Sequence, residues 1–217
     1  MGYRIKECFL TLQGEGAQTG RLSVFVRFSG CNNWSGRDVD RTKGPADCAR
    51  WCDTDFVGID GPGGGDFSAD EVVVRVQSLW PKGQEAPHVV LTGGEPALQV
   101  DKALVDALHE TGARLSIETN GSLPLPEGID WICVSPKRTV GGDPQALVVR
   151  KGQELKLVLP QSGFEAKDLE SLDFEHFFVQ PMDGPDAEAS LAFCMEWVRT
   201  YPRWKLSLQS HKILGIA

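Results

Sequence analysis

The sequence turns from apolar to polar in one step at Val89-Val90-Leu91-Thr92-Gly93-Gly94-Glu95-Pro96. An apolar run without alternation predicts a buried strand of a parallel sheet, because such strands are covered on both faces. A helix is expected before this strand, since Ser68 and Glu71 form a capping-box pattern ahead of an apolar periodicity that stops before Pro81. A second helical pattern follows, so a strand lies between two helices, as in an α/β fold.

Strands and helices continue to alternate in both directions from this stretch. Alternation of this kind favours parallel strands joined by right-handed crossovers, and therefore an α/β barrel or part of one. The expected strands cover residues 4–12, 22–28, 89–91, 115–117, 131–134, 155–159, 177–179 and 205–208, and the expected helices cover 69–80, 100–111, 166–172 and 187–201.

Length and composition restrict the class of protein. A chain of 217 residues favours one compact domain over residues 1–217. With 22 Lys and Arg against 30 Asp and Glu, the net charge of −8 argues against general nucleic-acid binding. No apolar run reaches the ~18 residues that span a bilayer. The first six residues lack a secretory signal pattern, so we expect a cytoplasmic protein without a membrane segment.

Polar groups follow five of the expected strands. Because the carboxyl ends of parallel strands gather on one face, these tips predict a ligand site there. The competing interpretation is that loops are polar for general reasons, which explains Gly and Pro better than Glu, Lys, Gln and His together. The five tips are 92–96, 118–121, 135–137, 180–183 and 209–212.

Three of the six cysteines form a candidate cluster, Cys31-x16-Cys48-x3-Cys52, within a polar stretch at about 30–66. Three thiolates suit a 4Fe-4S cluster or zinc and leave one coordination position open. A structural zinc site needs a fourth ligand, and the histidines at 88, 109, 176 and 211 are distant in sequence. Spacing alone leaves iron–sulfur, zinc and coincidence open. The other cysteines, at 8, 133 and 194, are expected to be buried apolar residues.

Motifs along the whole chain resemble those of the radical S-adenosylmethionine enzymes, and within them the 7-carboxy-7-deazaguanine synthase family. The Leu-Gln-Gly-Glu-Gly, Cys-Asp-Thr and Gln-Pro-Met-Asp motifs are the most restrictive. The matching segments are Thr11–Gly16, Arg27–Asn32, Trp51–Phe56, Thr92–Pro96, Glu118–Gly121, Ser135–Lys137, Gln180–Pro185 and His211-Lys212. The resemblance implies a partial parallel α/β barrel of the radical S-adenosylmethionine type.

The resemblance also implies a reaction. A 4Fe-4S cluster and S-adenosylmethionine would generate a radical that removes hydrogen from 6-carboxy-5,6,7,8-tetrahydropterin. The ring would then contract to 7-carboxy-7-deazaguanine with loss of ammonia, a carbon–nitrogen lyase reaction of queuosine biosynthesis. The family further implies Mg²⁺, a flavodoxin or ferredoxin as electron donor, and a homodimer.

Cysteine spacing departs from the pattern of the superfamily, which is x3 followed by x2. When Trp51-Cys52-Asp53 is aligned on the family, the middle cysteine falls on Ala49, so Cys48 is displaced by one residue. A helical turn would still place Cys48 and Cys52 on one face as an i, i+4 pair. We therefore expect Cys31, Cys48 and Cys52 to be the cluster ligands.

Other site residues carry over from matching motif positions. Mg²⁺ is expected on Thr54. S-adenosylmethionine is expected to contact Trp51, Cys52, Asp53, Gly94, Ser135, Pro136, Lys137, Gln180, Pro181, Met182 and Asp183. The pterin is expected to contact Leu12, Gln13, Gly14, Glu15, Arg27, Thr92, His211 and Ala217.

Residue chemistry leaves several roles open. Gly93 and Gly94 suit close backbone approach to the methionine amino group, and Glu95 offers an anionic acceptor. Arg27 is expected to bind the pterin carboxylate or to pair with a neighbouring Glu. Glu118 is either a site acceptor or a partner of Lys137, and His211 is either a substrate contact or a hydrogen-bonded residue at a strand end. Residues 34–47 are expected to form a solvated loop or a surface for the electron donor.

Two other functions remain open from the sequence. One is a related radical S-adenosylmethionine activase that places a glycyl radical on a protein, although such activases lack the Leu-Gln-Gly-Glu-Gly and Gln-Pro-Met-Asp pair. The other is a non-catalytic, zinc-stabilised binding protein.

Overall fold

A computed structural model describes residues 2–216, and its strands form one sheet in the order β3-β1-β2-β4-β5-β6-β7-β8-β9. β1 is antiparallel to both β2 and β3, whereas from β2 onward each neighbouring pair is parallel. The fold is a partial parallel α/β barrel, as the sequence predicted. The strands are Tyr3–Leu12 (β1), Leu22–Phe28 (β2), Gly65–Phe67 (β3), His88–Gly93 (β4), Arg114–Thr119 (β5), Trp131–Val134 (β6), Lys151–Leu159 (β7), Asp173–Pro181 (β8) and Trp204–Leu206 (β9).

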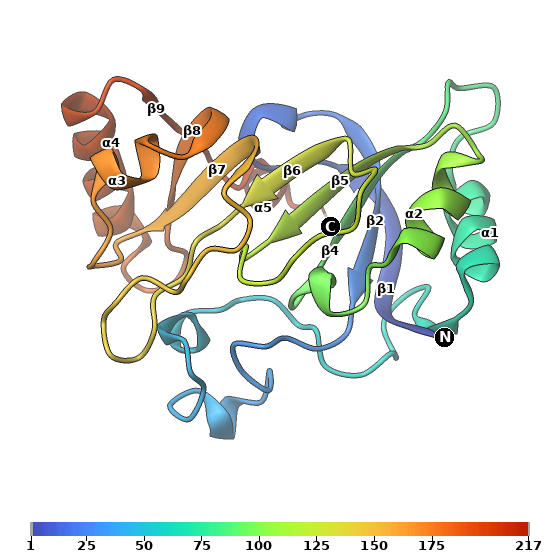
Figure 1. Cartoon of the computed structure of the whole chain (residues 1–217), viewed down its shortest axis with the longest axis horizontal. Helices are drawn as coiled ribbons and strands as arrows, with labels where there is room; N and C mark the ends of the chain where they lie inside the picture. Colours follow the sequence, from blue (N-terminus) through green and yellow to red (C-terminus); the bar gives the residue numbers. More distant parts are fainter. Residues whose placement is uncertain (1, 217) are drawn as a thin grey trace.

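Helices cover the sheet in two groups (Figure 1). α1 (Ala69–Leu79) and α2 (Lys102–His109) lie beside the first strands, and α3 (Ala166–Glu170) and α4 (Ala187–Thr200) beside the last ones. The capping box at Ser68 and Glu71 is present at the start of α1. One apolar core lies under α1 and α2, and a second under α3 and α4. No described helix is long and apolar enough to cross a bilayer.

Alternation along β7 separates the core from the interior of the barrel. Leu155, Leu157 and Leu159 are fully buried in the second core. Lys156 and Val158, between them, line the cavity at the other face of the sheet. The sequence of β7 has the continuous apolar pattern of a strand that is covered on both faces. In the structure, one face of β7 packs on the apolar core and the other faces the polar cavity.

Three expectations about secondary structure need correction. The short edge strand β3 was not expected, because its sequence, Gly65 to Phe67, carries no strand pattern. α5 (Ser210–Leu214) was not expected either, since five residues are too few for a helical period. β7 and β8 begin about four residues before the predicted strands. The first residues of the two strands are mostly polar, but their backbones still pair with each other.

The loop between β2 and β3 carries the three candidate cysteines and has a small core of its own. Trp34 is 6% exposed, and its ring meets Phe56 edge-on at 5.7 Å between centroids. Ala49 completes this core, and the Arg41 guanidinium lies 4.8 Å from the Trp34 centroid. The expectation of a solvated loop is therefore wrong for Trp34, although all residues from 35 to 45 are exposed or half-buried.

At the opposite end of the strands, a buried histidine connects three of them. His88 of β4 is 2% exposed. Its Nδ1 lies 2.7 Å from the Ser23 hydroxyl of β2, and its Nε2 lies 2.7 Å from the Ser116 hydroxyl of β5. Ser23 donates to the Arg21 carbonyl, so its oxygen accepts from Nδ1–H and the Ser116 hydroxyl donates to Nε2. Burial, together with Arg21 and Arg114, lowers the pKa of His88 to about 4.

Candidate active site

A cavity of about 450 Å³ opens at the carboxyl ends of the parallel strands, where the cysteine loop covers them (Figure 1). Most of the predicted site residues line it: Leu12, Gln13, Gly14, Glu15, Arg27, Cys31, Cys48, Trp51, Cys52, Asp53, Thr54, Thr92, Gly94, Ser135, Lys137, Gln180 and His211. Pro136, Pro181, Met182 and Asp183 are not in its lining. Ala217 lies outside the described residues.

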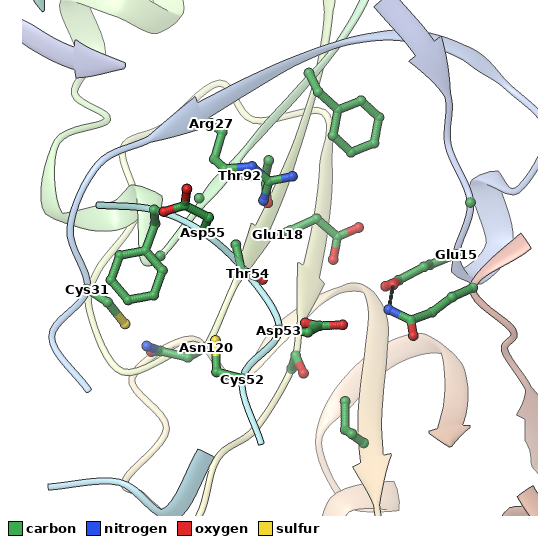
Figure 2. A pocket seen from close by; sticks show the side chains of 18 of the residues that line it. Glu15, Arg27, Cys31, Cys52, Asp53, Thr54, Asp55, Thr92, Glu118 and Asn120 are labelled. Atoms are coloured by element: carbon green, nitrogen blue, oxygen red, sulfur yellow. Dashed lines mark hydrogen bonds between the residues drawn. The ribbon is translucent and has the colours of Figure 1, made fainter. Parts of the chain in front are cut away.

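The three candidate thiols face this cavity from one side. Figure 2 shows Cys31 and Cys52 with their sulfur atoms directed toward the same space. The backbone N–H of Cys52 donates to the Cys48 carbonyl at 2.8 Å, so one helical turn connects these two residues as the spacing predicted. Asn33 donates from its backbone to Cys31 Sγ at 3.4 Å and from its side chain to Cys48 Sγ at 3.6 Å. Ala49 faces the small core instead.

The sulfur donors of these thiols suit a 4Fe-4S cluster. Among residues 2–216, no three His, Cys, Asp or Glu side chains converge on a point where one metal ion could bind. A 4Fe-4S cluster does not need such convergence, because each thiolate binds a different iron. Burial raises the pKa of Cys31 to about 11 and also raises that of Cys48. Donors from Asn33 are available to a bound thiolate.

Cationic side chains lie at the rim beside the thiols. Lys137 donates to the Ser135 hydroxyl at 2.7 Å, and its Nζ lies 5.5 Å from the centroid of the Trp51 ring. Lys137 is therefore not the partner of Glu118 that the sequence allowed. Lys212 of α5 bridges Asp53 and Asp183, and so ties the turn after β8 to the cysteine loop.

The Gly-Gly-Glu tip of β4 has a packing role that the sequence did not predict. A Cβ at Gly93 would lie 2.3 Å from the Phe28 carbonyl oxygen, and one at Gly94 would lie 2.2 Å from that of Gly30. Both glycines are required because the end of β4 lies close against the backbone at and just after the end of the neighbouring strand β2. Glu95 is fully buried and does not line the cavity. It accepts from the Thr119 hydroxyl at 2.6 Å and from the backbone of Asn120 at 2.8 Å, so it fixes the tip of β5.

Another part of the cavity lining carries groups suited to a polar ring. Arg27 donates from Nε to Glu7 at 2.7 Å, which is the neighbouring-Glu partner considered from the sequence. Its terminal nitrogens lie near Thr92 in the cavity (Figure 2). Phe9 and Phe25 stack at 5.7 Å and add an apolar surface. This part of the lining therefore combines a cation, a hydroxyl and an aromatic face.

Thr54 and Asp55 lie on the cysteine loop where it crosses the cavity (Figure 2). Asp55 pairs with the buried Lys6 of β1 at 3.0 Å, and Lys6 also binds Asp60 at 2.9 Å. These contacts fix the loop to β1. Thr54 has a hydroxyl in the cavity lining, where Mg²⁺, which keeps most of its waters, could take it as a single protein ligand.

Lys156, Glu15 and Glu118 form one part of the cavity lining, which we call the floor. The sequence did not predict that Lys156 belongs to the site. Lys156 is 3% exposed and pairs with Glu15 at 2.6 Å and with Glu118 at 3.0 Å. Gln13 donates to the other oxygen of Glu118 at 3.2 Å. A charged residue inside the apolar run Leu155–Leu159 was the available signal.

α5 closes the cavity from the side of the last strand. The Ser210 backbone and hydroxyl both donate to the Gly14 carbonyl at 2.9 Å, and Gln209 donates to Glu15 at 3.0 Å, the dashed bond in Figure 2. A Cβ on Gly14 would lie 2.1 Å from His211 Nδ1. His211 is therefore a helix residue packed on Gly14 at the cavity, rather than a residue at a strand end.

A partial parallel barrel with three thiols over the carboxyl ends of its strands defines a radical S-adenosylmethionine enzyme. No family model matches the chain. It is 54% identical over 217 residues to the 7-carboxy-7-deazaguanine synthase of Burkholderia multivorans and 50% identical over 217 residues to that of Caulobacter vibrioides, with all of each chain covered. The crystal structure of QueE from Escherichia coli matches with a TM-score of 0.67 at 26% identity, over 96% of this chain and 94% of that one. The chain belongs to the 7-carboxy-7-deazaguanine synthase family.

Proposed function

We propose that the chain converts 6-carboxy-5,6,7,8-tetrahydropterin into 7-carboxy-7-deazaguanine with release of ammonia. The activity is that of a carbon–nitrogen lyase of queuosine biosynthesis. One observation carries the proposal: three thiols and a set of groups suited to a planar polar ring line the same cavity. The pterin would lie between them, so that a reacting carbon is close to the cofactor side.

Cys31, Cys48 and Cys52 would hold the 4Fe-4S cluster. S-adenosylmethionine would be held beside the cluster by Trp51, Cys52, Asp53, Gly94, Ser135, Pro136, Lys137 and the Gln180–Asp183 turn. When bound, these groups supply one-electron cleavage chemistry and thereby hydrogen-atom abstraction. Support for Cys48 as the middle ligand is its place in the cavity lining, since Ala49 packs into the small core.

The remaining lining residues would orient the substrate. Arg27 keeps its terminal nitrogens for the pterin carboxylate, because only Nε is engaged by Glu7. Gln13 and Glu15, with the backbone of Leu12 and Gly14, would meet the amide and amino edges of the ring, and Thr92 would add a hydroxyl. His211 on α5 would cover the ring from solvent. Thr54 would hold Mg²⁺ against substrate oxygens.

Two partners complete the proposal on the strength of the family resemblance. A flavodoxin or ferredoxin would reduce the cluster, and two copies of the chain would form a homodimer. Sedimentation of the purified protein tests the second point, and a monomer at all concentrations would remove it.

The function is tested with anaerobically purified protein, reconstituted with iron and sulfide and supplied with 6-carboxytetrahydropterin, S-adenosylmethionine and dithionite. Mass spectrometry should detect 7-carboxy-7-deazaguanine. Product should disappear in Cys48→Ala and persist in Cys194→Ala, a matched variant at a buried thiol of α4 outside the cavity. A fully loaded brown cluster that makes no product would exclude the synthase reaction, and a protein that takes up no iron would exclude the cluster.

A further inference from the structure

The floor of the cavity contains a buried cation between two carboxylates from distant parts of the chain. Lys156 comes from β7, Glu118 from β5, and Glu15 from the segment after β1. Both glutamates line the cavity and place an oxygen against the same ammonium, at 2.6 Å for Glu15 and 3.0 Å for Glu118. Each carboxylate has a second oxygen, which accepts from Gln209 or Gln13, respectively.

Around Lys156, the hydrogen-bond acceptors of the floor outnumber its cationic donors. Glu154 also approaches from β7, but burial raises its pKa, and it accepts from the Ala17 backbone at 3.1 Å. Cys133 of β6 is buried beside it with a raised pKa and therefore carries no charge. His211 faces Glu15 from α5. Although burial alone would raise the pKa of Glu15, Lys156 lowers it to about 2. The pKa of Lys156 lies well above its ordinary value because of the surrounding carboxylates, which outweigh the cost of burial.

We propose that Lys156 is a positioning residue that holds the carboxylates of Glu15 and Glu118 side by side as acceptors for a ligand edge with two N–H donors. This inference rests on the proposed function, in which the pyrimidine edge of the pterin supplies those donors. Without the cation, two carboxylates this close would repel each other, and one would take up a proton. A protonated carboxyl presents a donor where the ligand also presents one, so recognition would fail.

Lys156→Met tests the inference because it keeps the length of the side chain and removes its charge. The probe is 6-carboxypterin, whose fluorescence reports binding to the anaerobically reconstituted protein without turnover. The affinity of the wild-type protein for 6-carboxypterin should stay constant as the pH is lowered from 7.5 to about 5. In Lys156→Met we expect at least a tenfold loss at pH 7.5 and a steep further loss as the pH falls. Lys156→Arg should stay within about threefold, and so should the surface control Lys102→Met.

A ligand-free measurement separates this inference from the proposed function. ¹³C NMR of protein labelled at the glutamate carboxyl groups follows the ionisation of Glu15 and Glu118 directly. The Glu15 resonance should remain that of a carboxylate at pH 5 in wild type, and one of the two glutamate resonances should titrate at higher pH in Lys156→Met than in wild type. If wild type does not bind 6-carboxypterin, the proposed substrate is wrong, while the NMR titration still decides whether Lys156 keeps both groups charged.

Folding is controlled with the double variant Lys156→Met/Glu118→Gln, which removes one charge of each sign and leaves fewer unpaired buried groups than Lys156→Met alone. The Tm of the double variant should be close to that of wild type. It should still bind 6-carboxypterin only weakly, because the amide of Gln at position 118 presents N–H donors in place of one of the carboxylate acceptors. A folded Lys156→Met protein with wild-type affinity and an unchanged pH profile would overturn the inference. So would glutamate resonances that titrate identically with and without the lysine.

Discussion

Acidification should loosen the end of the barrel opposite the cavity through His88. The histidine is buried and connects β2, β4 and β5 in its neutral form. Its pKa falls from the ordinary 6.5 to about 4 in the folded protein. Between these two values the unfolded chain binds a proton that the folded chain does not, so unfolding becomes easier as the pH falls.

The size of this effect follows from the two pKa values. One pKa unit corresponds to about 1.36 kcal/mol, so the full shift is worth about 3 kcal/mol below pH 4. Between pH 7.5 and pH 5 the loss attributable to His88 is about 2 kcal/mol. For a chain of this length that corresponds to a drop in Tm of roughly 4–8 °C.

Urea unfolding of wild type and His88→Gln at both pH values measures this contribution. The variant should be less stable at pH 7.5 and should lose about 2 kcal/mol less than wild type at pH 5. Glu95 and Glu154, whose raised pKa values act in the opposite direction, are present in both proteins and cancel in the comparison. The control His176→Gln removes a half-buried histidine of β8. Equal losses in wild type and His88→Gln would refute the reasoning.

Three further predictions concern the cavity and its supports. The exchange Cys48→Ala/Ala49→Cys should not restore iron binding, measured by the visible absorbance of the reconstituted protein, because position 49 faces the small core. Glu95→Ala should lower the free energy of unfolding by about 3–5 kcal/mol in urea, since it strands buried donors, whereas Glu95→Gln should cost about half of that. Gly14→Ala should weaken pterin binding about tenfold or more, because its Cβ would displace His211; the added change His211→Ala should return α5 to wild-type protease resistance.

The main architecture was predictable because the parallel strands are covered on both faces. Their apolar runs stand out between polar tips, and the capping box at Ser68 marks a helix start that depends on local sequence alone. The tips could also be assigned to one site, since parallel strands end at the same face. The residues that the sequence placed there mostly do line one cavity.

Roles that depend on tertiary partners were not predictable. Glu95 follows a strand like the site residues, but the donors that bury it come from β5. Lys156 lies in an apolar run, and only the folded sheet shows that its neighbours are carboxylates. α5 is too short to form alone and exists because Ser210 binds Gly14. Each of these contacts joins segments whose proximity no local pattern encodes.

The bonds that close the cavity have a consequence for how the protein folds. They join Gly16 to Ser207, Glu15 to Gln209 and Gly14 to Ser210, pairs separated by 191, 194 and 196 residues. Closing such long loops costs entropy before any contact compensates for it, so these bonds should form last. A refolding chain would then regain its circular dichroism before it binds a pterin. For a time, such a chain would be nearly folded yet unable to recognise its substrate.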